Sequence, residues 1–277
     1  MHASFSNLLS PLKVRNVTLR NRMVKPATTL GFAEHDGTAG PMITEFYETI
    51  ARGGVGLVIV ESSCVDFPVG GKGENRLLVD NDRFIPSFTR LAEAIHKHGC
   101  PTFLQVTHNG PAGAFSGIPP LVPSLLSPED NPEADPRMQY ESPREMTLAD
   151  IEMVVEKHAR AAWRAKQAGF DGVEFHGCAA YLLNSFLSRA WNHRQDDYGC
   201  QSLENRARIV TDIIRAARSL VGEDFVLGVR INGIELGHPK GTTAAEAAGI
   251  ARILQDAGLD IISVASWGYG KGEYGWA

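Results

Sequence analysis

The amino-acid sequence predicts an α/β protein in which a parallel sheet is covered by helices. Short, almost entirely apolar runs recur along the chain, as expected for strands that are buried on both faces of a parallel sheet. Each run follows a polar stretch with helical periodicity and a glycine-containing turn, and this alternation is typical of parallel α/β folds. The pattern is seen in segments 51–62, 96–106, 166–177, 221–232 and 255–266.

The elements can be placed in order along the chain. A first strand is expected after the turn-like Arg15-Asn16-Val17. A long helix is expected over 148–167, because Thr147 with Asp150 three residues later resembles a capping box. The expected strands lie at about 23–28, 56–62, 102–107, 171–176, 226–231 and 260–265.

The ends of these strands help to choose between two architectures, because an open doubly wound sheet and a (β/α)8 barrel both fit the alternation. No Gly-x-Gly-x-x-Gly follows the first strand, which argues against a dinucleotide-binding sheet. Polar residues stand at the C-terminal end of strand after strand, where a barrel collects its active site, although polarity also returns wherever a buried strand ends. The barrel is favoured, with a mouth formed by Thr28, Thr29, Glu61, Ser62, Gln105, His108, His176, Arg230 and Ser266.

The composition is that of a globular protein with a sizeable core, since 43% of the 277 residues are hydrophobic and 21% are charged. The net charge of −5 comes without a long basic run, so no nucleic-acid partner is expected. No apolar run reaches the ~18 residues of a membrane span, and the N-terminal segment lacks the apolar core of a signal peptide. The four cysteines lack metal-ligand spacing. We therefore expect no metal site, and reduced thiols in a cytoplasmic protein.

Five stretches carry a more specific pattern: SPLKVRNVTLRNRMVKPATT, GGVGLVIVES, LQVTHNG, AGFDGVEFHGCAAYLLNSFLSRAWNHRQDDYG with SLENRAR, and VRIN. Together they resemble the old yellow enzyme family of FMN-dependent ene reductases. The closer likeness is to its bacterial branch of 2,4-dienoyl-CoA reductase-like and NADH:flavin oxidoreductase-like proteins. The resemblance runs from about Leu8 to Gly268. It implies a (β/α)8 barrel that holds FMN at its C-terminal mouth, with NADH or NADPH as reductant.

The resemblance also implies which residues contact FMN. The end of the first strand lies against the isoalloxazine in this family, which assigns Pro26, Ala27, Thr28 and Thr29 to the flavin. One threonine or cysteine there tunes the flavin potential. An ungapped alignment matches it to Thr29, whereas the local Pro-Ala-Thr pattern matches it to Thr28, so both assignments stay open.

Three further FMN contacts come from later strands. Ser62 corresponds to the small residue that packs beside the flavin, and Gln105 to the glutamine that bonds the pyrimidine edge. Arg230 corresponds to the arginine beside N1 and O2, where a fixed cation stabilises the negative charge of reduced flavin. From the residues alone, each could instead be structural: Gln105 could hydrogen-bond backbone groups, and Arg230 could pair with Glu174 or another neighbour.

The active-site residues follow from the same resemblance. The family uses a histidine, and a second histidine or asparagine three residues later, to bond the carbonyl oxygen of an activated alkene. A tyrosine two residues further protonates the α-carbon. His176 matches the first donor and Tyr181 the acid, but Ala179 stands where the second donor belongs. A different substrate, a water, the nearby Cys178, or loss of activity could each account for this departure.

The family barrel would continue with two more βα units after the sixth strand, including loops that normally bind the FMN phosphate. We therefore expect residues 1–277 to form one FMN-binding barrel domain, truncated after about six βα units, with an unpaired sheet edge. Within segment 191–206 we expect a structural, buried set of polar residues. This set is Asn192, Arg194, Asp197 and Arg206.

The predicted function is reduction of the C=C bond of an α,β-unsaturated carbonyl or enoyl thioester by NAD(P)H through FMN. A degenerate, non-catalytic barrel used for binding or assembly is one alternative, motivated by Ala179 and by the expected truncation of the barrel. A flavin-free lyase or isomerase with Lys25 as Schiff-base former is another. The small-molecule substrate, the choice between NADH and NADPH and any homo-oligomer stay open. The proline-rich segment 111–143 is the expected specificity element.

Overall fold

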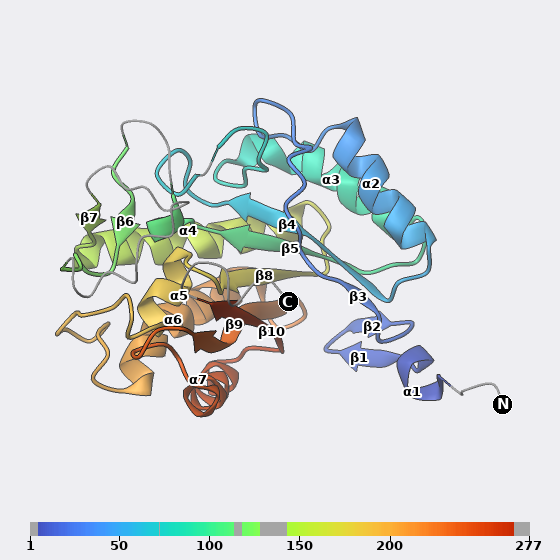
Figure 1. The fold of residues 1–277 in the computed structure, drawn as a ribbon. Helices are drawn as coiled ribbons and strands as arrows, with labels where there is room; N and C mark the ends of the chain where they lie inside the picture. Colours follow the sequence, from blue (N-terminus) through green and yellow to red (C-terminus); the bar gives the residue numbers. More distant parts are fainter. Residues whose placement is uncertain (1–4, 72, 114–117, 128–142, 269–277) are drawn as a thin grey trace.

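A six-stranded parallel sheet forms the centre of the computed structural model, which describes residues 5–71, 73–113, 118–127 and 143–268. The strands follow one another in the order β10-β9-β8-β5-β4-β3 and curl like part of a barrel wall (Figure 1). This confirms the predicted α/β fold as a partial (β/α) barrel, with a strand at each expected place. The strands are β3 (Val24–Lys25), β4 (Leu57–Cys64), β5 (Thr102–Thr107), β8 (Gly172–Gly177), β9 (Val226–Leu236) and β10 (Ile261–Gly268).

Five helices cover the sheet and pack against one another in chain order. The predicted helix over 148–167 is confirmed, because Thr147 and Asp150 form a complete capping box at the start of α4. The helices are α2 (Pro41–Arg52), α3 (Ile85–His96), α4 (Leu148–Gln167), α6 (Leu203–Val221) and α7 (Ala244–Asp256). Shorter elements are α1 (Ser6–Leu9), β1 (Leu12–Val14), β2 (Val17–Leu19), β6 (Leu121–Val122), β7 (Arg144–Glu145), α5 (Leu182–Leu187) and two 3₁₀ turns, Asp82–Phe84 and Gly110–Ala112.

The strands are apolar on both faces, and their two faces belong to different cores. On β4, Val58 and Val60 pack in the core beneath the helices, whereas Leu57 and Ile59 pack in a second cluster on the opposite face. This follows from the alternation of side chains along a strand. The second cluster also contains Val17 from β2, so the β1–β2 hairpin closes the end of the barrel at which the strands begin.

The two edge strands are more exposed than the strands between them. Val264 on β10 is 64% exposed and Val24 on β3 is 42% exposed, while β4, β5 and β8 in the middle of the sheet are buried along almost their whole length. Within the described ranges each edge strand has one neighbour in the sheet, which agrees with the expected unpaired edge.

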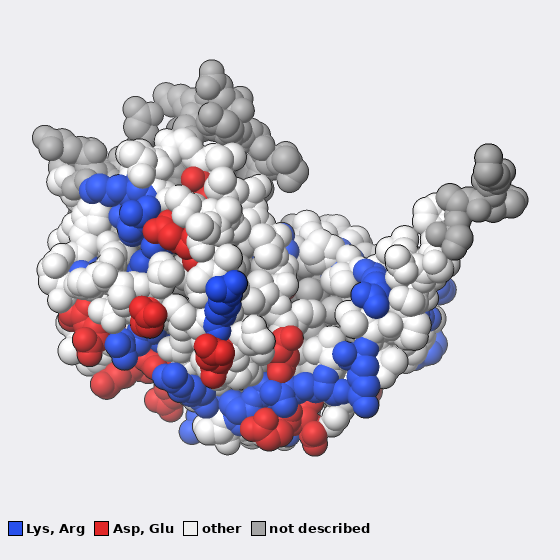
Figure 2. All heavy atoms as spheres, turned by 90° about the horizontal axis from the view of Figure 1, so that it is seen from below, with Lys and Arg blue, Asp and Glu red and all other residues white. Residues whose placement is uncertain are grey.

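Charged side chains of both signs are interspersed on the face that Figure 2 shows. Among the helices of the described ranges, none is both long enough and apolar enough to cross a membrane. The same ranges contain no group of three or more His, Cys, Asp and Glu side chains arranged to hold a metal ion.

Candidate active site

On the concave face of the sheet, polar side chains follow the second apolar cluster in the direction of the C-terminal ends of the strands. The Gln105 side-chain amide donates a hydrogen bond of 2.6 Å to Glu174, its direct neighbour across β5 and β8. Arg230 donates a hydrogen bond of 2.6 Å to Ser263 on β10. Burial raises the pKa of Glu174, although the bond from Gln105 and the charge of Arg230 act in the opposite direction. The polar strand residues therefore form a paired layer inside the barrel.

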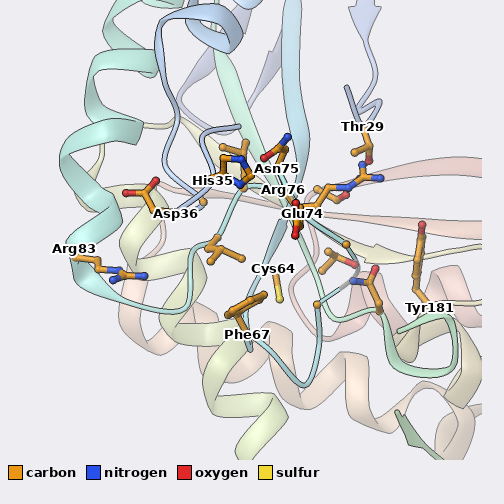
Figure 3. Close-up of a pocket in the computed structure, with 18 residues that line it drawn as sticks. Thr29, His35, Asp36, Cys64, Phe67, Glu74, Asn75, Arg76, Arg83 and Tyr181 are labelled. Carbon is orange, nitrogen blue, oxygen red and sulfur yellow. The ribbon is translucent and has the colours of Figure 1, made fainter. Parts of the chain in front are cut away.

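A cavity of about 340 Å³ opens at the end of the barrel where the strands terminate. Thr29 and Tyr181 lie on one side of it, and Asp36 and Arg83 lie on the other (Figure 3). Its volume falls in the range of small-molecule sites. The full lining is Thr29, His35, Asp36, Gly37, Ser62, Cys64, Phe67, Gly71, Gly73, Glu74, Asn75, Arg76, Leu77, Leu78, Arg83, Thr107, Asn109 and Tyr181.

His176 and Tyr181 lie against each other beside this cavity. Their ring centroids are 4.5 Å apart, with the rings edge to face at 63°. His176 is the penultimate residue of β8, and Tyr181 caps the short helix α5 five residues later. The intervening turn thus brings together the imidazole of His176 and the phenol of Tyr181.

The protonation of His176 follows from its surroundings. Burial, and then the positive charge of Arg230, lower the pKa of His176 to about 3, so the imidazole is neutral at neutral pH. Its Nε2 contacts the Cys178 sulfur at 3.2 Å, and burial raises the pKa of that thiol to about 12. The buried Nδ1 has no hydrogen-bond partner among the described residues. Within the described part of the chain this nitrogen is therefore a hydrogen-bonding group without a partner, which is uncommon for a buried polar atom.

The turn between the two residues is held in a strained conformation at Ala179. Its φ of +55° lies in the left-handed region, which non-glycine residues rarely adopt. The Asn232 side-chain oxygen accepts a hydrogen bond of 3.0 Å from the Ala179 amide, and the Asn184 side chain donates one of 2.6 Å to the Ala179 carbonyl. Cys178 is 5% exposed, absent from the cavity lining and bonded to His176. The Cys178 thiol is thus engaged with the histidine, and whether it takes the place of the missing donor stays a prediction.

The sequence model of the NADH:flavin oxidoreductase / NADH oxidase family matches residues 7–269. The chain belongs to this family. The match takes in every strand of the sheet and both members of the His176–Tyr181 pair, and FMN is the flavin of the family. The resemblance inferred from the motifs is thereby confirmed.

Known members of this flavin oxidoreductase family resemble the chain over most of its length. It is 36% identical to an NADH oxidase of Thermoanaerobacter brockii over 95% of this chain and 39% of that protein. It is 35% identical to an NADPH dehydrogenase of Bacillus pumilus, over 94% of this chain and 73% of that protein. The chain thus spans well under half of the first relative and about three quarters of the second.

Solved structures show the same fold. A 2-naphthoyl-CoA reductase in complex with 2-naphthoyl-CoA superposes with a TM-score of 0.85 at 30% identity, over 95% of this chain and 41% of that one. An old yellow enzyme homologue from Zymomonas mobilis gives a TM-score of 0.81 at 26% identity, over 94% of this chain and 73% of that one. The partial barrel is therefore part of the flavin oxidoreductase barrel.

The residues predicted to contact the flavin divide into two groups in the structure. Thr29 and Ser62 line the cavity with their hydroxyls 3.3 Å apart, whereas Thr28 turns back to the Pro26 carbonyl at 3.4 Å and does not line it. Gln105 and Arg230 belong to the paired layer. Geometry therefore favours Thr29 over Thr28 as the residue that faces a ligand.

The polar residues of segment 191–206 are structural, with one correction. Asn192 is 1% exposed and donates hydrogen bonds of 3.0 and 2.7 Å to two backbone carbonyls. Arg206 is 2% exposed and donates to a backbone carbonyl at 2.6 Å and to a carboxylate at 2.8 Å. The prediction for Asp197 is wrong, because this side chain is exposed and Asp196 pairs with Arg194 instead. Asp196 and Asp197 could each form an ion pair with Arg194, and the direction of the backbone in this turn decides that Asp196 does so.

Several residues of the cavity and its support were not predicted from the sequence. His35, Asp36, Glu74 and Arg76 reach the cavity from loops after β3 and β4, and Figure 3 shows Arg76 extending toward Thr29. Loop residues carry no periodic signal, so only homologous sequences or the fold could have identified them. Of the expected specificity segment 111–143, residues 114–117 and 128–142 lie outside the described residues.

Replacing Ala179 by glycine is expected to cost almost nothing, unlike the same change at its neighbour. At Ala180, which is 2% exposed and has no positive φ, glycine should lower the free energy of unfolding by about 1.5 kcal/mol through lost burial and chain entropy. At Ala179 the relief of left-handed strain, about 1–2 kcal/mol, offsets this loss. Urea denaturation of both variants measures the difference, and equal losses would contradict the strain.

Proposed function

We propose that this protein is an FMN-dependent oxidoreductase that reduces the C=C bond of an α,β-unsaturated carbonyl or enoyl thioester with NADH or NADPH. The observation that carries the proposal is the His176–Tyr181 pair, with rings 4.5 Å apart, next to the cavity of a flavin oxidoreductase barrel. The pair supplies one hydrogen-bond donor for a carbonyl oxygen and one acid for a carbon, which is what alkene reduction requires.

The residues at the barrel mouth suit FMN. Pro26, Ala27 and either Thr28 or Thr29 would lie against the ring system, with Ser62 beside it. Gln105 would bond the pyrimidine edge, and Arg230 would place its cation near the atoms that become negative on reduction. The unpartnered His176 Nδ1 and the Thr29–Ser62 pair at the cavity are the features of the chain that support this fit. When bound, FMN supplies the hydride that reaches the β-carbon.

The side chains of the protein would carry out the remaining steps. A neutral imidazole holds one proton, and the thiol of Cys178 can donate to Nε2, which leaves the proton on Nδ1. His176 would then donate from Nδ1 to the carbonyl oxygen and stabilise the charge that develops there. The Tyr181 hydroxyl would give its proton to the α-carbon and be reprotonated from solvent. Ala179 leaves the carbonyl with one side-chain donor from this turn.

Two alternatives make different predictions. A degenerate barrel used for binding is motivated by Ala179, which cannot donate from its side chain. The lyase alternative is disfavoured, because Lys25 does not line the cavity. Its ammonium instead donates to the Pro26 carbonyl at 2.6 Å and lies over the rings of Phe46 and Tyr47.

We further propose small molecules as the partners of the protein. We also propose a cytoplasmic location, in keeping with its four free thiols.

The test is anaerobic flavin spectroscopy. Purified protein incubated with FMN is expected to retain the flavin, to bleach when NADH or NADPH is added, and to regain its absorbance when an enone or enoyl thioester follows. Protein that stays colourless with FMN contradicts the proposal. Bleaching that no enone or thioester reverses supports the degenerate barrel.

A further inference from the structure

A buried carboxylate, Glu235, lies behind the turn that carries the candidate active-site pair. It is 5% exposed, and both of its oxygens are occupied. Oε1 accepts hydrogen bonds from the side-chain amides of Asn184 at 2.8 Å and Asn232 at 3.1 Å. Oε2 accepts from the Ser188 hydroxyl at 2.6 Å and from the Thr242 amide at 2.8 Å. Four donors on one buried carboxylate make a rigid centre for the surrounding polar groups.

An irregularity in β9 lets Glu235 reach Asn232. Residues three apart in a regular strand point to opposite faces of the sheet. Here Ala265 of β10 pairs with Asn232 and the next residue, Ser266, pairs with Ile234, so Gly233 is an extra residue in β9. A Cβ at Gly233 would lie 2.5 Å from Val264. A larger residue at Gly233 would therefore require the Val264 side chain to move, and the bulge brings Asn232 and Glu235 to the same side.

The carboxylate determines the orientation of the two asparagine side chains. A carboxylate can only accept, so each asparagine must turn its NH₂ group toward Glu235. The oxygen of Asn232 is then left to accept from the Ala179 amide at 3.0 Å, and Asn184 also donates to the Ala179 carbonyl at 2.6 Å. Both polar groups of the left-handed residue are therefore held by side chains that Glu235 orients.

We propose that Glu235 is a positioning residue for alkene reduction. It acts through Asn184 and Asn232, which hold Ala179 in its left-handed conformation and so keep Tyr181 against His176. The inference rests on the proposed function of that pair. Without the carboxylate the two amides are free to flip, and the turn loses the contacts that compensate its strain.

The kinetic test compares the two half-reactions in Glu235→Gln. Reoxidation of the reduced flavin by an enone should slow by about 10–10²-fold, because the proton donor is misplaced. Reduction of the flavin by NADPH should be unchanged, because it does not use Tyr181 as acid. Asp150→Ala, which destabilises the capping box of α4 far along the chain, is the control for general loss of stability. Equal slowing of both half-reactions in Glu235→Gln, or no slowing of either, overturns the proposal.

A second test needs neither flavin nor activity. In Glu235→Gln, amide hydrogen exchange of a peptide covering 177–182 should be about tenfold faster, the change expected when one hydrogen bond of typical strength is lost. Asn232→Ala should produce the same acceleration, and the double variant should add nothing further, because both act on the Ala179 amide. Peptides from α4 and α6 report whether the variants remain folded.

The exchange test also separates this inference from the proposed function. If the wild-type protein with FMN fails to bleach or to reduce any enone, the proposed function fails, and the exchange of peptide 177–182 still decides whether Glu235 holds the turn. Unchanged exchange in a folded Glu235→Gln variant, with acceleration in Asn232→Ala, shows that Asn232 acts without Glu235 and overturns the proposal.

Discussion

Replacing Tyr181 with phenylalanine is expected to slow enone-dependent reoxidation of the reduced flavin by about 10²–10⁴-fold, the usual contribution of general acid catalysis. Reduction of the flavin by NAD(P)H should be unaffected. The phenylalanine keeps the edge-to-face contact with His176, which lies 4.5 Å away between ring centroids, and removes only the proton donor. Stopped-flow absorbance of the flavin in each half-reaction is the measurement.

Two further variants make the result specific. Tyr198→Phe removes another tyrosine hydroxyl, one that donates to Asp212 at 3.0 Å and does not line the cavity, so both half-reactions should be unchanged. His176→Ala should weaken binding of the enone and also slow its reduction, because the turn then offers no side-chain donor for the carbonyl. If flavin-loaded Tyr181→Phe and His176→Ala both reduce enones at the wild-type rate, the assignment of this pair is wrong.

The largest effect on stability is expected at Glu246. This residue completes a capping box with Thr243 at the start of α7 and also accepts a hydrogen bond of 2.8 Å from Arg206, whose side chain is 2% exposed. Glu246→Ala leaves a buried guanidinium without its carboxylate, which typically costs about 3–5 kcal/mol. The free energy of unfolding, measured in urea, should fall by about that amount.

The capping box of α4 supplies a matched control. Asp150 caps the helix with Thr147 in the same way, but its arginine partner, Arg144, is 49% exposed. Asp150→Ala should therefore cost only about 1–2 kcal/mol, from the lost cap and a weak surface pair. Glu246→Gln retains the cap and removes only the charge beside Arg206. This variant should therefore still lose most of the stability by which Glu246→Ala exceeds Asp150→Ala. Equal losses at the two helices would show that the buried arginine contributes nothing.

The pH dependence of these two carboxyl groups has the same sign. The Arg144 bond is the largest influence that lowers the pKa of Asp150. Burial raises the pKa of Glu246, but bonds from Thr243 and Arg206 outweigh it, so this pKa is also lowered. The unfolded chain therefore binds protons at a higher pH than the folded chain. This contribution to stability is complete above the usual carboxyl pKa and is lost as the pH falls below it.

The sequence alone determined the positions of the strands, the helix start at Thr147 and the family. These features depend on neighbouring residues: an apolar run makes a buried strand, and a threonine with an acid three residues later makes a cap. The spacing between His176 and Tyr181 is also local, because both residues lie at the end of one strand and the start of the next helix. Features of this kind can be predicted without knowing how the rest of the chain folds.

Other features were decided by the tertiary structure. Thr28 and Thr29 have the same chemistry, and only the close approach of β3 and β4 places the Thr29 hydroxyl near Ser62. Asp196 rather than Asp197 pairs with Arg194 because the turn between them points one side chain outward. Adjacent residues in loops differ in direction, and no periodic pattern reports that direction.

Glu235 is the clearest case of a residue that the sequence could not identify. Its link to Ala179 runs through hydrogen bonds of Asn232, and Ala179 itself lies on a different βα unit. The connection requires parallel pairing of β8 with β9, the extra residue at Gly233 in β9, and two asparagine side chains from separate segments. Strand register and bulges are set by hydrogen bonds between segments far apart in the chain, so the contacts that hold the turn exist only once the sheet has formed.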